Sequence, residues 1–120
     1  MVVTFIIVGG FILFDVVSGI LKAFATTGLN STALRQGLYH KLSEILAVVG
    51  SALLEYACAY IQLGIDLPFM SIVSVYVCTM EIISVLENLS TVNPQLAELF
   101  KPYLEKLKAK DGENDVSKFD

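Results

Sequence analysis

The sequence predicts an all-α membrane protein with three transmembrane helices, a short amphipathic cytoplasmic helix and a disordered charged tail. Three apolar stretches lie at about residues 2–21, 42–65 and 67–86. A helix rises about 1.5 Å per residue, so roughly 20 residues match a hydrocarbon core of about 30 Å. Hydrophobic residues make up 55% of the 120 residues and charged residues 17%, and the mean hydropathy is +0.69. This composition is more apolar than that of an ordinary soluble domain.

The distribution of basic side chains predicts the orientation of the three spans. Lys22, Arg35 and Lys41 lie around the loop after the first span, and the other five lysines lie in the C-terminal tail. The turn between the second and third spans has no basic residue and contains Asp66. Because positively charged short loops stay in the cytoplasm, we expect the N-terminus outside and the C-terminus inside. A cleaved signal peptide is the alternative for the first span, but that span lacks a basic start and contains Asp15.

The predicted domains are a transmembrane domain over residues 1–92, an amphipathic cytoplasmic helix over 93–109 and a disordered tail over 110–120. Asn93 and Pro94 are typical of a helix cap followed by a first helical residue. We expect the helix to lie on the inner leaflet, whose anionic lipids attract lysines, or against a neighbouring subunit. The residues expected at the membrane surface are Leu96, Leu99, Phe100, Lys101, Tyr103, Lys106 and Lys108.

Each predicted span carries at least one carboxylate, and such residues are expensive at mid-bilayer unless they face protein or water. Helical spacing places the carboxylates on stripes with other polar or small residues. These stripes either pack helices and subunits together or line a water-filled opening, and one stripe can serve both purposes in turn. The predicted pore or assembly seam contains Asp15, Ser18, Gly19, Lys22, Lys41, Glu44, Ser51, Glu55, Ser74, Glu81, Ser84 and Asn88.

The sequence offers little support for catalysis. His40 is the one histidine, and no metal-ligand spacing, phosphate loop or nucleophile motif accompanies it. Cys58 and Cys78 fall inside the apolar spans, where small buried residues are expected rather than a disulfide. The net charge of −4 argues against a nucleic-acid partner. We therefore expect a non-enzymatic protein without a cofactor or metal.

Three short blocks carry a resemblance to a known family. Their characteristic residues are Asp15, Ser18, Gly19, Lys22 and Ala23 in the first, Gly37, His40 and Lys41 in the second, and Glu81, Ser84, Glu87 and Asn88 in the third. In order and spacing the blocks resemble bacteriophage holins of the toxin-secretion/phage-lysis type, over most of the chain up to about Leu89. His40 stands where these holins usually have a basic residue.

The resemblance implies a holin that oligomerises in the bacterial cytoplasmic membrane and forms timed lesions or pores for host cell lysis. Its expected partners are the lipid bilayer and copies of itself, with a functional link to an endolysin or toxin that requires no direct contact. We hypothesise that Asp15, Glu55 and Glu81 carry the switch to opening, supported by a set of polar neighbours: Ser18, Lys22, Ser84 and Asn88. Two alternatives stay open: a small ion or proton channel or transporter subunit that uses Glu55 and Glu81, and an antiholin-type inhibitor.

Overall fold

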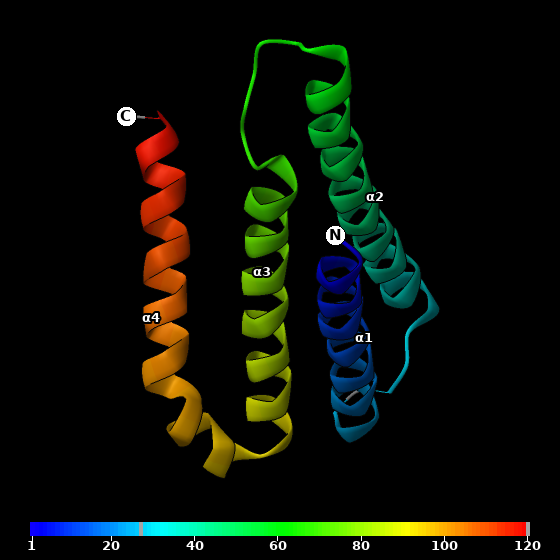
Figure 1. Ribbon diagram of the computed structural model, residues 1–120. Coiled ribbons are helices and arrows are strands. Elements are labelled where there is room, and N and C mark those ends of the chain that lie inside the picture. The colour runs from blue at the N-terminus through cyan, green and yellow to red at the C-terminus, as the bar shows by residue number, and fades with distance from the viewer. Residues whose placement is uncertain (27, 120) are drawn as a thin grey trace. The chain divides into compact units, whose positions relative to one another are not determined.

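The computed structural model of this chain is all-helical over the residues that it describes (Figure 1). It describes the backbone of residues 1–26 and 28–119 and the side chains of residues 1–26 and 28–109. The four helices are α1 (Val2–Ala25), α2 (Ser31–Ile61), α3 (Phe69–Val92) and α4 (Pro94–Phe119). The first three are long and apolar enough to cross a membrane, which confirms the predicted all-α fold with three candidate spans.

The ends of the helices differ from the predicted spans. α1 ends at Ala25, four residues after the predicted end of the first span. α3 runs from Phe69 to Val92, so it begins two residues later and ends six residues later than the predicted third span. α2 ends at Ile61, four residues before the predicted end, because Gln62 adopts a left-handed conformation with φ 57° and ψ 57°. Gly64 also has a positive φ of 77°. The connection to α3 is therefore longer than the tight turn expected from the sequence.

α2 is longer than a bilayer requires. Its 31 residues correspond to about 46 Å, against a hydrocarbon core of about 30 Å. The helix begins at a well-formed cap, where the Asn30 side-chain oxygen accepts a hydrogen bond of 2.9 Å from the Thr32 amide. The first turns of α2 contain Thr32 and Arg35. This polar beginning lies outside the part of α2 that the hydrocarbon core can hold.

Replacing Asn30 with Ala is expected to destabilise the start of α2 by about 1 kcal/mol, because the substitution removes the cap. Thermal unfolding of the full chain in detergent micelles, followed by circular dichroism, measures the change. The variant Asn30→Asp is the matched control, since aspartate keeps an oxygen that can accept the same hydrogen bond. Equal unfolding of Asn30→Ala and the unmodified chain would contradict the expectation.

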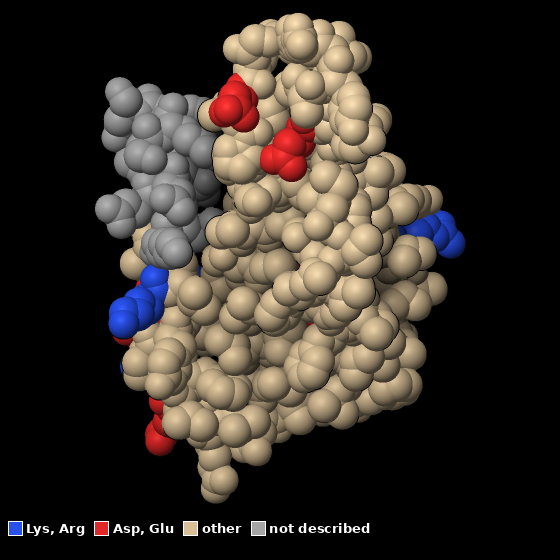
Figure 2. Space-filling model, viewed as in Figure 1, with Lys and Arg blue, Asp and Glu red and all other residues tan. Residues whose placement is uncertain are grey.

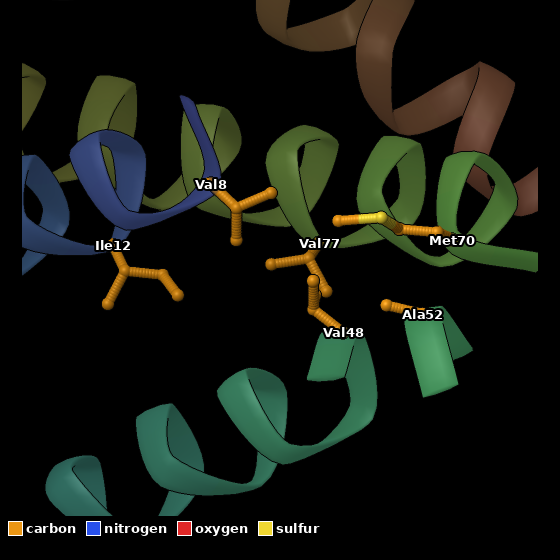
Figure 3. Packing of buried hydrophobic residues seen from close by; sticks show 6 residues of the cluster. All are labelled: Val8, Ile12, Val48, Ala52, Met70 and Val77. Carbon is orange, nitrogen blue, oxygen red and sulfur yellow. The ribbon is translucent and has the colours of Figure 1, made fainter. Parts of the chain in front are cut away.

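The chain forms two compact units, which are described separately. The first unit contains residues 1–12 and 30–78, and the second contains residues 13–29 and 79–120. An apolar cluster in the first unit draws one pair of buried side chains from each of three helices (Figure 3). These are Val8 and Ile12 of α1, Val48 and Ala52 of α2, and Met70 and Val77 of α3. Their spacings of four and seven residues place each pair on one helical face.

Large apolar side chains also cover the outside of the membrane-spanning helices. Ile6 and Leu53 are 67% and 69% exposed, and many other Leu, Ile, Val and Phe side chains are similarly accessible. Figure 2 shows a face on which charged side chains are sparse. Such a surface is a liability in water and is the expected surface in contact with lipid.

In the second unit, α4 contacts α3 through charged side chains. Lys108 Nζ of α4 lies 2.7 Å from Glu87 Oε1 of α3. Pro102 lies inside α4 and removes the amide hydrogen that would bond the carbonyl of Glu98; Figure 1 shows α4 bent in its N-terminal part. The predicted disorder of residues 110–120 is not confirmed, since α4 continues to Phe119. The side chains of this segment and all of Asp120 lie outside the described residues.

Reversing the charge of Lys108 is expected to loosen α4 from α3. Lys108→Glu places a second carboxylate beside Glu87, and because both side chains are about half exposed the effect is below about 1 kcal/mol. Hydrogen exchange of the α4 backbone should become faster. The charge-swapped pair Lys108→Glu with Glu87→Lys should restore slow exchange, and Lys106→Glu controls for the loss of a lysine on the same helix. Unchanged exchange in Lys108→Glu would show that the ion pair does not hold α4.

Candidate functional site in the membrane-spanning helices

The clearest polar contact between spans lies in the second unit and joins α1 to α3. Asn88 Nδ2 donates one hydrogen bond to Asp15 Oδ1 at 3.1 Å and another to Ser18 Oγ at 3.1 Å. The Ser18 hydroxyl in turn donates to the backbone carbonyl of Asp15 at 3.0 Å. We call these three residues the Asp15–Asn88 network. Both hydrogens of the Asn88 amide are thereby used between two helices.

Helical spacing explains why α1 presents both acceptors to Asn88. Asp15 and Ser18 are three residues apart and therefore share a face of the helix. Gly19 is next to them, and a Cβ atom built on it would lie 3.7 Å from Asn88 Nδ2, which is an ordinary contact. The close approach of α1 to Asn88 therefore does not require a glycine at position 19. Lys22, one turn later, is half-buried.

Two carboxyl groups of the second unit, those of Asp15 and Glu81, are deeply buried near the centres of their helices. Asp15 is 7% exposed and Glu81 is 1% exposed. Glu81 lies twelve residues after the start of α3 and eleven before its end, and Ser84 and Asn88 continue its face at half-buried positions. An ionised side chain at such a depth costs about 2.5–3.5 kcal/mol on insertion scales. A carboxyl group at such a depth is stable only where protein partners, water or a proton compensate for its burial.

The first unit contains a second group of predicted seam residues. Ser51 and Ser74 are buried, and the Ser51 hydroxyl donates to the Val48 carbonyl of its own helix at 2.7 Å. The Ser74 hydroxyl has no hydrogen-bond partner among the described residues. Glu55 is half-buried and forms no ion pair or hydrogen bond with a described residue.

The Glu44 carboxylate lies in a charged cluster that the sequence analysis only partly anticipated. Glu44 Oε1 is 2.7 Å from His40 Nε2 and 4.0 Å from Lys41 Nζ, all within α2. The side chains of Glu44 and Lys41 are 11% and 14% exposed, whereas that of His40 is 71% exposed. Lys41 and Glu44 were predicted seam residues, but His40 was not. Its i, i+4 spacing to Glu44 was the signal that could have identified the pair.

Every predicted seam residue is buried or half-buried, but the two units divide the set. Within the second unit, Asp15, Ser18, Gly19 and Asn88 come together through the contacts above. The seam's role in a pore or in assembly stays a prediction. Of the predicted membrane-surface residues, Leu96 and Phe100 are half-buried, while the exposed ones are Leu99, Lys101, Tyr103, Lys106 and Lys108. Among the described residues, no group of His, Cys, Asp or Glu side chains is placed to hold a metal ion.

Three long apolar helices, two of which bury a carboxyl group near their centre, define a multi-pass helical membrane protein. Residues 1–109 match the model of the bacteriophage holin family, and the chain belongs to this family. It is therefore a holin-family protein of the cytoplasmic membrane, which confirms the resemblance found in the sequence. The family is not one of enzymes. No curated protein and no solved structure matches the chain.

Proposed function

We propose that this protein assembles with copies of itself in the bacterial cytoplasmic membrane and opens lesions at a set time. An endolysin or a toxin then passes through the lesions towards the cell wall. The single observation that carries this proposal is the Asp15–Asn88 network, a polar contact between two apolar spans. A contact of this kind can be exchanged for water or for the same groups of another copy.

The energetics of the network suit a switch. Hydrogen bonds between helices in membranes contribute about 0.6 kcal/mol each on average. Burying an ionised carboxylate near the bilayer centre costs several times more. The packed state is therefore held by weak bonds, and the carboxyl groups of Asp15 and Glu81 would gain hydration in a water-filled opening. Assembly into a water-filled lesion offers that hydration.

The orientation of the chain is part of the proposal. We place the N-terminus outside, with the α1–α2 loop and α4 in the cytoplasm. The support comes from the basic residues, which lie beside that loop and in the C-terminal segment. Lys101 and Lys106 are exposed on α4, where anionic lipids attract lysines by about 1 kcal/mol each. We therefore propose that the side of α4 that carries these lysines contacts the inner leaflet.

Expression of the protein alone in bacteria tests the proposal. Membrane potential, viability and release of a folded cytoplasmic reporter protein are followed after induction. Abrupt depolarisation with release of the reporter to the periplasm is the expected result. The absence of any effect, despite membrane insertion shown by fractionation, would overturn the proposal and favour an antiholin-type inhibitor.

A second candidate function, a narrow ion or proton pathway, is favoured by Glu55. This carboxylate is half-buried in α2 and has no partner among the described residues. Ionisable groups at membrane depth often mark ion or proton pathways. Depolarisation with the folded reporter retained, and sensitivity of that depolarisation to Glu55→Gln, would favour this candidate over large lesions.

A further inference from the structure

The connection between α2 and α3 in the first unit exposes three large apolar side chains. Residues 62–68 contain Leu63, Ile65 and Leu67, which are 50%, 48% and 51% exposed. They alternate with smaller or polar residues along a segment without regular secondary structure. The segment contains no lysine or arginine, and its one charged residue is Asp66. We call residues 62–68 the apolar loop.

Backbone geometry fixes the apolar loop beyond the ends of the two helices. Gln62 and Gly64 both have positive φ, which ends α2 before these side chains can continue its surface. At the other end the Phe69 amide donates to the Leu67 carbonyl at 2.9 Å. Met70 follows at once and is 3% exposed within the apolar core of the unit. The loop is thus held close to that core, and its own apolar side chains stay outside.

Tyrosines indicate where the hydrocarbon core ends on α2. Tyr56 and Tyr60, just before the loop, have stacked rings with centroids 4.5 Å apart and are 55% and 72% exposed. Tyr39, near the other end of α2, is 65% exposed. Tyr39 and Tyr60 are 21 residues apart in one helix, and that separation is about 31 Å, the thickness of a hydrocarbon core. Because tyrosine is enriched at membrane interfaces, these residues bracket the embedded part of α2.

We propose that the apolar loop is a lipid anchor, with Leu63, Ile65 and Leu67 inserted into the bilayer interface beside Tyr60. The loop follows directly on Tyr60 and Ile61, which are 72% and 68% exposed at the end of α2, so the bilayer around α2 is the partner. Its lack of basic residues means that apolar insertion, rather than attraction to anionic headgroups, holds it there. The anchor sets the depth of α2 and α3 in the membrane. The proposal requires a membrane-spanning chain and does not depend on lesion formation.

Tryptophan fluorescence tests the anchor, because the chain contains no tryptophan of its own. Ile65→Trp is introduced into the full chain in phosphatidylcholine vesicles. The matched control is Asp66→Trp in the same loop, and Val49→Trp in the middle of the embedded part of α2 is the deep reference. We expect Ile65→Trp to emit at shorter wavelength than Asp66→Trp and to be protected from aqueous iodide. Lipids brominated near the headgroup should quench it more than lipids brominated near the chain ends, with the reverse order for Val49→Trp.

Two outcomes would overturn the lipid anchor. Equal emission and equal iodide quenching of Ile65→Trp and Asp66→Trp would place the loop in water. Protection from iodide that is lost on dilution of the protein in lipid, without quenching by brominated lipid, would show that a second copy covers the loop. Circular dichroism confirms that each variant keeps its helices. Because the assay measures depth, a failed lysis experiment leaves its result unaffected.

Discussion

Cells that express the variant Asn88→Leu are expected to lose their membrane potential earlier after induction than cells with the unmodified protein. The substitution removes the two hydrogen bonds from Asn88 Nδ2 to Asp15 and Ser18 and keeps a side chain of similar size. At about 0.6 kcal/mol for each bond, the packed state loses about 1 kcal/mol, a shift of about fivefold towards opening. Time-resolved fluorescence of a potential-sensitive dye measures the time of opening, at protein levels matched by immunoblot.

A matched control separates this effect from a general disturbance of α3. Thr91→Val lies on the same helix, where the Thr91 hydroxyl donates only to the Glu87 carbonyl one turn earlier. It should leave the time of opening unchanged. Asn88→Asp is a stronger test, because it places a second carboxylate against Asp15 and should advance opening further. If Asn88→Leu opened at the normal time or later, the network would not hold the packed state.

The fold was readable from the sequence because bilayer thickness imposes a length on every span. Hydropathy and length predicted three spans, and the structure contains three helices that meet both criteria. The end of α2 was not readable in the same way. Leu63, Ile65 and Leu67 keep the sequence apolar beyond the helix, whereas the helix ends through the left-handed backbone of Gln62. Hydropathy is insensitive to that backbone change.

The sequence predicted which site residues share a face within each helix. Spacing placed Asp15 with Ser18 and Glu81 with Asn88, because residues three, four or seven apart share a helical face. The partner across helices was not readable, since Asn88 contacts Asp15 over a separation of 73 residues. That pairing depends on how α1 and α3 pack in the second unit. Periodicity within either helix carries no information about this packing.

Glu81→Gln is expected to have the opposite effect and to delay opening. Glu81 is 1% exposed at the middle of α3, where an ionised side chain costs about 2.5–3.5 kcal/mol. Glutamine keeps the size of the side chain but cannot ionise, so a water-filled opening gains less by hydrating it than by hydrating a carboxylate. The expected delay exceeds the advance caused by Asn88→Leu. The same dye measurement follows it, with Glu98→Gln on the exposed surface of α4 as the control for loss of a carboxylate.

The two variants are expected to shift the time of opening in opposite directions, and this distinguishes two roles for the seam. A seam that only glued helices together would lose packing in both variants, and both would open early or fail to assemble. A seam that exchanges protein contacts for water instead gives early opening for Asn88→Leu and late opening for Glu81→Gln. The double variant should then open late, because the carboxylate hydration that the opening loses outweighs the two lost hydrogen bonds. Early opening of Glu81→Gln alone would remove the buried carboxylate from the switch and leave it a packing role.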